Sequence, residues 1–136
     1  MSEEKEMSAI ANVTVPASFK NTVNIGKWIK GKSVDSAISM LLKVIEKEIP
    51  LPCVRFNKDV PHKKGLGFGG RYPKNACEHA IKTLKLLKDN AKAKGFDESK
   101  LIITEFIANY AISKNKKARH NAGKSTHIMI KAEVKQ

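Results

Sequence analysis

The chain has 136 residues and carries 26 Lys and Arg against 13 Asp and Glu, a formal net charge of +13. This length suits one domain with a modest core, and so large a basic excess is typical of proteins that bind a polyanion. No apolar run reaches the roughly 20 residues of a membrane-spanning helix. Two lone cysteines, Cys53 and Cys77, argue against a disulfide framework, and the acidic N-terminus is unlike a secretory signal. We therefore expect a soluble, cytoplasmic protein.

The N-terminal part of the chain predicts a tail, a strand and a helix. Residues 1–8 form the charged tail, and residues 9–136 the domain. Ala9–Val15 has the β-branched character of a strand and ends at Pro16. Pro16 can open a helix that runs to about Lys30, where Gly31 stops it. The apolar stripe of this helix is Phe19, Val23 and Ile29, with Trp28 beside it.

Two further helices flank a long irregular segment. Ser33 can cap a helix whose apolar residues keep helical spacing until Ile49, and Pro50 ends it. Residues 51–72 contain four glycines within an irregular stretch, and loops of this length are usually functional or disordered. Pro73 then opens a lysine-rich helix that Gly95 closes, with Cys77 on its apolar face as a core residue.

The last third of the chain predicts two strands joined by a basic arm. Apolar residues alternate from Leu101 and again from Ile128 to Val134, which places the paired strands near Phe106–Ile112 and Ser125–Val134. Residues 114–124 between them hold five Lys or Arg and no acid. Unpaired charges are too costly to bury, so this tip requires either water or a polyanion. We expect it to be mobile in the free protein and ordered by RNA, the alternative being a solvated loop.

Two glycine segments imitate nucleotide-binding motifs. Residues 118–125 match a relaxed phosphate-loop pattern, but the eleven residues that follow alternate as a strand where that loop needs a helix. Residues 65–70 have dinucleotide-fingerprint spacing, but no βαβ unit surrounds them. The glycines could instead bring the backbone close to phosphate, with Phe68 and Tyr72 offering faces to bases, or they could form a flexible surface loop. The four histidines do not cluster, so we expect no catalytic residue, no metal site and no cofactor.

The order of these elements, together with five sequence blocks, resembles a known family. The blocks are Ile29-Lys-Gly-Lys-Ser-Val34, Pro61-His-Lys-Lys-Gly65, Gly70-Arg-Tyr-Pro-Lys-Asn-Ala76, Leu86-Leu-Lys-Asp-Asn-Ala-Lys-Ala-Lys-Gly-Phe-Asp97 and Thr126-His-Ile-Met-Ile130. They are similar to the archaeal and eukaryotic branch of the universal large-subunit ribosomal protein family twenty-two, called seventeen in eukaryotic cytosolic naming. The resemblance covers roughly residues 15–134.

The resemblance implies an α+β fold, with three helices packed on a small antiparallel three-stranded sheet and a basic β-hairpin arm at about 109–127. It implies a structural, non-enzymatic constituent of the large ribosomal subunit. Such a protein binds large-subunit RNA near the nascent-peptide exit tunnel, contacts neighbouring ribosomal proteins and supports assembly. The family's arm has a Pro-Arg-Ala-x-Gly-Arg tip, which Lys117-Ala-Arg-His-Asn-Ala-Gly-Lys124 matches only in part on a shorter arm. The expectation of RNA binding carries over to this shorter arm, whereas contact with the tunnel wall does not.

The residues expected to bind RNA are basic or aromatic side chains of the glycine segment, the start of the following helix and the arm. These are His62, Lys63, Lys64, Arg71, Tyr72, Lys74, Lys114, Lys116, Lys117, Arg119, His120 and Lys124. Two other classes of function remain open from the sequence. One is a free-standing regulatory protein that binds nucleic acid outside the ribosome, and the other is an enzyme that binds nucleotide through the glycine segments.

Overall fold

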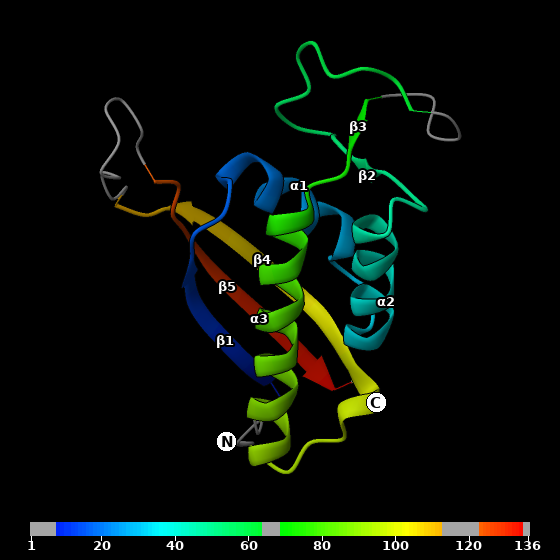
Figure 1. Ribbon diagram of the computed structural model, residues 1–136. Coiled ribbons are helices and arrows are strands. Elements are labelled where there is room, and N and C mark those ends of the chain that lie inside the picture. The colour runs from blue at the N-terminus through cyan, green and yellow to red at the C-terminus, as the bar shows by residue number, and fades with distance from the viewer. Residues whose placement is uncertain (1–7, 64–68, 113–122, 135–136) are drawn as a thin grey trace.

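The computed structural model describes residues 8–63, 69–112 and 123–134. Its centre is an antiparallel three-stranded sheet with the strand order β1-β5-β4. The strands are β1 (Ser8–Val15), β4 (Leu101–Tyr110) and β5 (Thr126–Val134). The last strand of the chain therefore lies in the middle and pairs with both others (Figure 1). This arrangement confirms the predicted sheet.

Three helices complete the α+β fold, as predicted: α1 (Phe19–Ile29), α2 (Val34–Ile45) and α3 (Lys74–Ala93). Helix α3 packs on β1 and β5, α1 packs on β4, and α2 packs mainly against α3. All three lie on one side of the sheet (Figure 1). The core between the layers is aliphatic, with Ile25, Leu84 and Ile130 among its fully buried side chains. None of the helices in the described part of the chain is long and apolar enough to cross a membrane.

Helix boundaries follow local capping chemistry more closely than they follow proline positions. Helix α1 begins at Phe19 and not at Pro16, because the hydroxyl of Ser18 accepts a hydrogen bond from the backbone of Asn21. Ser33 caps α2 as predicted. That helix ends at Ile45, well before Pro50, and Lys47 follows with a φ of 60°. The predicted end was wrong because the chain leaves the helix in this left-handed conformation before proline acts.

Strand β4 contains a β-bulge that the alternation pattern did not predict. Ile103 pairs with Ala132 and Glu105 pairs with Lys131, so Thr104 is an extra residue, and its hydroxyl donates to the Lys131 carbonyl. A bulge inserts one residue and exchanges the two faces of the strand. Ile103 and Phe106 consequently both face the helices. The strand ends at Tyr110, two residues before the predicted end at Ile112.

The segment predicted to be irregular contains a second, two-stranded sheet. Strand β2 (Leu51–Pro52) pairs antiparallel with β3 (Gly70–Arg71), and an isolated bridge joins His62 to Gly69. A Cβ atom at Gly69 would lie 2.9 Å from the side chain of Val60, so this contact requires glycine. The pairing of β2 with β3 therefore holds the two ends of the intervening segment together.

Several predictions fall outside the described residues. These include the N-terminal tail up to residue 7, part of the glycine segment with Lys64 and Phe68, and the tip of the arm with Lys114, Lys116, Lys117, Arg119 and His120.

Candidate nucleic-acid interface

Five of the predicted RNA-binding residues lie close together in the chain around β3. His62, Arg71 and Lys74 are exposed, while Lys63 and Tyr72 are half-buried. The backbone beneath them is tied down, because Gly70 donates to the Pro61 carbonyl at 3.3 Å and Cys53 donates to the Gly69 carbonyl at 3.1 Å. Arg71 also pairs with Leu51 in the small sheet. The Arg71 guanidinium therefore projects from an anchored backbone position.

Tyr72 already has a cationic neighbour within the protein. The ammonium nitrogen of Lys63 lies 5.8 Å from the centre of the Tyr72 ring, within the range of a cation–π contact. One face of this ring is therefore engaged by the chain itself. The predicted role of Tyr72 in stacking on bases stays a prediction.

Neither cysteine has the properties of a nucleophile. Burial raises the pKa of the Cys77 thiol to about 12, and Cys77 is fully buried in the core as predicted. Burial also raises the pKa of Cys53, an effect that the nearby Arg71 guanidinium partly opposes. Both thiols therefore stay protonated near neutral pH, which is the unreactive form.

Three aromatic rings from distant parts of the chain meet at the end of β4. We call Phe19, Phe56 and Tyr110 the aromatic cluster. The rings of Phe19 and Tyr110 stack with their centres 3.9 Å apart, and Phe56 meets Phe19 edge-on at 6.0 Å. Tyr110 remains 69% exposed despite this contact. The cluster therefore presents an aromatic surface to solvent.

Basic side chains border the aromatic cluster. The Lys20 ammonium lies 5.6 Å from the centre of the Phe56 ring, and the Arg55 guanidinium lies 5.1 Å from it. Lys124, one of the predicted RNA-binding residues, lines the same hollow as Lys20 and Tyr110. We call Lys20, Arg55 and Lys124 the basic rim. Aromatic faces bordered by cations are the usual chemistry of binding to unpaired nucleic acid.

A buried asparagine fixes Arg55 in this position. The side chain of Asn24 in α1 donates to the Arg55 carbonyl at 3.0 Å and accepts from the Arg55 amide at 3.1 Å. Asn24 is only 2% exposed. Its amide group thus satisfies both backbone groups of Arg55 and holds the adjacent Phe56, whose φ is 55°, against α1.

The aromatic cluster, Lys20 and Arg55 were missed by reasoning from the sequence. Phe19 belongs to the apolar stripe of the first predicted helix, and Tyr110 lies in the alternating stretch that begins at Leu101. The runs of positive charge lie elsewhere, in the predicted arm and the glycine segment. A weak signal was present, because Arg55 and Phe56 adjoin each other inside a long basic loop. Figure 1 shows the reason for the omission: the start of α1, the β2–β3 segment and the end of β4 reach the same end of the molecule from distant parts of the chain.

The lysines of α3 divide into exposed charges and one structural ion pair. Lys82, Lys85 and Lys92 are exposed. Lys88 instead donates to the Asp35 carboxylate at 2.7 Å and has Glu98 at 3.9 Å. The hydrogen bond to Asp35 raises the pKa of Lys88. Lys88 thus links α3 to α2, and we do not assign it to RNA.

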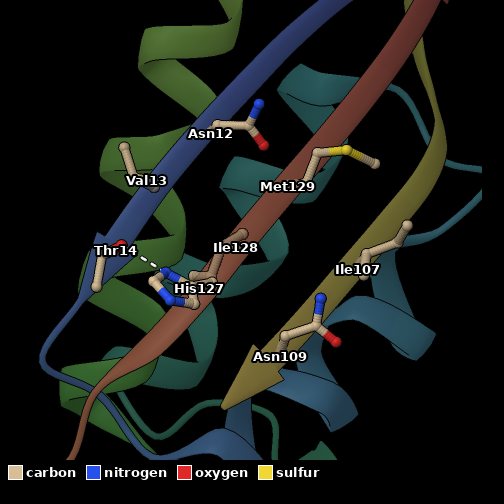
Figure 2. Close-up of a pocket in the computed structure, with 8 residues that line it drawn as sticks. All are labelled: Asn12, Val13, Thr14, Ile107, Asn109, His127, Ile128 and Met129. Carbon is tan, nitrogen blue, oxygen red and sulfur yellow. Dashed lines mark hydrogen bonds between the residues drawn. The ribbon is translucent and has the colours of Figure 1, made fainter. Parts of the chain in front are cut away.

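The outer face of the sheet has a different character. Figure 2 shows a hollow there, with Thr14, His127 and Asn109 in one cross-strand row and Asn12, Met129 and Ile107 in the next. The only hydrogen bond drawn joins Thr14 to His127, at 2.6 Å. In the adjoining row, Lys131 lies opposite Glu105. None of the described residues that line this hollow is a lysine or an arginine, so it lacks the positive charge that borders the aromatic cluster.

The described residues offer no set of side chains suited to a metal centre. Across residues 8–63, 69–112 and 123–134, no three or more His, Cys, Asp and Glu side chains come together to form a ligand set.

The family model for ribosomal protein L22p/L17e matches residues 11–134, nearly the whole chain. The chain belongs to the ribosomal protein L22p/L17e family. Every described residue of the basic rim and of the aromatic cluster lies within the matched range. The family named by the match is the one that the five sequence blocks resemble.

Archaeal members of the L22p/L17e family are among the relatives found. The large ribosomal subunit protein uL22 of Archaeoglobus fulgidus is 35% identical over 74% of this chain and 66% of its own length. The uL22 of Picrophilus torridus is 39% identical over 74% of this chain and 68% of its own. The uL22 of Nanoarchaeum equitans is 34% identical over 85% and 72%, respectively. The chain therefore matches about two thirds of the length of these relatives.

Proposed function

We propose that this protein is a structural constituent of the large ribosomal subunit that binds large-subunit ribosomal RNA. The family match over residues 11–134 carries the proposal, because the related archaeal proteins are named as components of that subunit. The net charge of +13 and the basic rim beside the aromatic cluster support RNA as the ligand. We place it, as the family resemblance implies, near the exit tunnel in cytoplasmic ribosomes, beside neighbouring ribosomal proteins and without an enzymatic role.

The proposed mechanism is electrostatic. Lysine and arginine side chains displace counterions from RNA phosphates, while the fold determines where these cations lie. Arg71 and Arg55 suit this task best, because the small sheet anchors one backbone and Asn24 anchors the other. A planar guanidinium can bind one phosphate through two nitrogens or stack on a base, which a lysine cannot do.

Sedimentation of the tagged protein in cell extract tests the assignment to the ribosome. Co-migration with large subunits at moderate salt is expected, with release as salt rises because the contacts are ionic. Protein that stays free of subunits yet binds purified RNA would instead indicate a free-standing regulatory protein. Binding of ATP or NAD, measured by calorimetry, would contradict the structural role and favour an enzyme.

A further inference from the structure

A small hollow lies between the start of α1 and the ends of β4 and β5. It measures about 280 Å³ and is lined by Ala17, Ser18, Phe19, Lys20, Tyr110, Lys124 and Ser125. This volume lies just below the usual range for drug-sized ligands, so a single planar ring system suits it better than an extended molecule. Two of the lining residues are lysines and none is acidic.

The walls of the hollow are held by hydrogen bonds. The fully buried Thr126 hydroxyl donates to the Ala17 carbonyl at 2.8 Å, and the Ala111 amide donates to the Ser125 carbonyl at 3.2 Å. The Asn75 side chain, in the first turn of α3, donates a hydrogen bond to the Pro16 carbonyl at 3.0 Å. The residues just before α1 are therefore tied to β5 and α3, and the ends of β4 and β5 are tied to each other, so a ligand would not have to order these segments.

Tyr110 has one ring face stacked on Phe19, and among the described residues most of its surface is open to solvent. Phe19 stacks on it with an interplanar angle of 27°, yet Tyr110 keeps 69% of its surface exposed. A tyrosine braced in this way loses little conformational entropy when a second ring stacks on its open face. Stacking of an unpaired base on such a ring is a common mode of RNA recognition.

The charges beside Tyr110 match the rest of a nucleotide. Lys20 and Lys124 line the hollow with the ring, so a stacked base would have cations next to its backbone phosphates. The first turn of α1 contains no acidic residue, and the positive end of the helix adds to the same potential. A base inside an A-form duplex is covered on both faces by its neighbours, so this site favours unpaired RNA.

We propose that Tyr110 stacks on an unpaired base of the bound RNA while Lys20 and Lys124 bind the flanking phosphates. The proposal rests on the proposed function and adds to it the kind of RNA element that this end of the protein recognises. Stacking contributes to affinity without releasing counterions, whereas each lysine contributes through counterion release. The two contributions can therefore be separated by their dependence on salt.

The test compares a labelled oligoadenylate with a labelled RNA duplex of the same length, using fluorescence anisotropy at several salt concentrations. Tyr110→Leu removes the aromatic face but keeps apolar bulk. We expect it to weaken binding of the single strand about fivefold or more, with an unchanged salt slope and no change for the duplex. Tyr110→Phe should bind within about twofold of the wild type, because its ring can still stack. Lys124→Ala should lower the single-strand salt slope by about 0.7.

Ile107→Ala, a truncation of another exposed β4 residue on the outer face of the sheet, is the matched control and should leave both affinities unchanged. Thermal melts establish that each variant is folded at the binding temperature. Equal affinity of Tyr110→Leu and wild type for the single strand overturns the proposal, as does an equal loss on the duplex. If the wild type sediments with large subunits in that case, only the stacking site fails. If Tyr110 dependence is found in a protein that never joins the subunit, the ribosomal role fails and the stacking site stands.

Discussion

Replacing Asn24 with alanine tests whether the fold positions Arg55. The substitution removes two hydrogen bonds, of 3.0 and 3.1 Å, between the Asn24 side chain and the Arg55 backbone. A net contribution of about 0.5–1.5 kcal/mol for each bond gives a loss of about 1–3 kcal/mol. Because Arg55 is exposed, water can replace part of these bonds, and we expect the lower half of that range.

Urea unfolding followed by circular dichroism measures this loss. With a slope of about 2 kcal/mol per molar urea, the midpoint should fall by about 0.5–1 M. Native-state hydrogen exchange should show faster exchange at the Arg55 amide. The affinity for ribosomal RNA at fixed salt should also fall, although the variant keeps the charge of +13. These measurements separate the position of the guanidinium from its charge.

Asn21→Ala is the matched control, because it makes the same change in the same helix at a side chain with no such bond to Arg55. Both variants share the gain in helix propensity of alanine over asparagine, so their difference isolates the two hydrogen bonds. Equal urea midpoints for the two variants, together with unchanged exchange at Arg55, would refute the positioning role of Asn24.

Four further predictions concern the interface and the core. Arg71→Lys should weaken RNA affinity in filter binding more than Lys82→Ala does, and equal effects would show that only net charge matters. Gly26→Ala should lower stability in thermal melts by about 1–3 kcal/mol, because its Cβ would collide with the Phe106 ring; an unchanged melt would contradict the inward placement of Phe106. Cys77 should react with iodoacetamide only in denaturant, since its pKa of about 12 and its burial keep it protonated and shielded. Stability should also fall as pH rises above about 9, because the unfolded thiol then releases its proton while the folded thiol keeps it. Rapid labelling of Cys77 by iodoacetamide in the native protein would contradict the predicted protection of this thiol.

Features that depend on neighbouring residues could be read from the sequence. Ser33 caps α2 as predicted because the capping bond spans only three residues. Gly31 and Gly95 follow α1 and α3 with φ values of 86° and 82°, conformations that few other residues adopt easily. The period of two in the last third placed β5 correctly to within one residue, whereas β4 begins at Leu101, before the predicted start at Phe106. The sequence blocks identified the family.

Features that depend on contacts between distant residues could not be read in this way. The bulge at Thr104 follows from pairing with Lys131 across the sheet, and it decides which face of β4 carries Phe106. Positive charge was enough to make Arg71 and Lys124 candidates from the sequence. The stack of Phe19 on Tyr110, in contrast, exists only because α1 packs on β4. Local propensity and capping involve energies between residues a few positions apart. The aromatic cluster forms only once burial of the core has brought the start of α1, the β2–β3 segment and the base of the arm together.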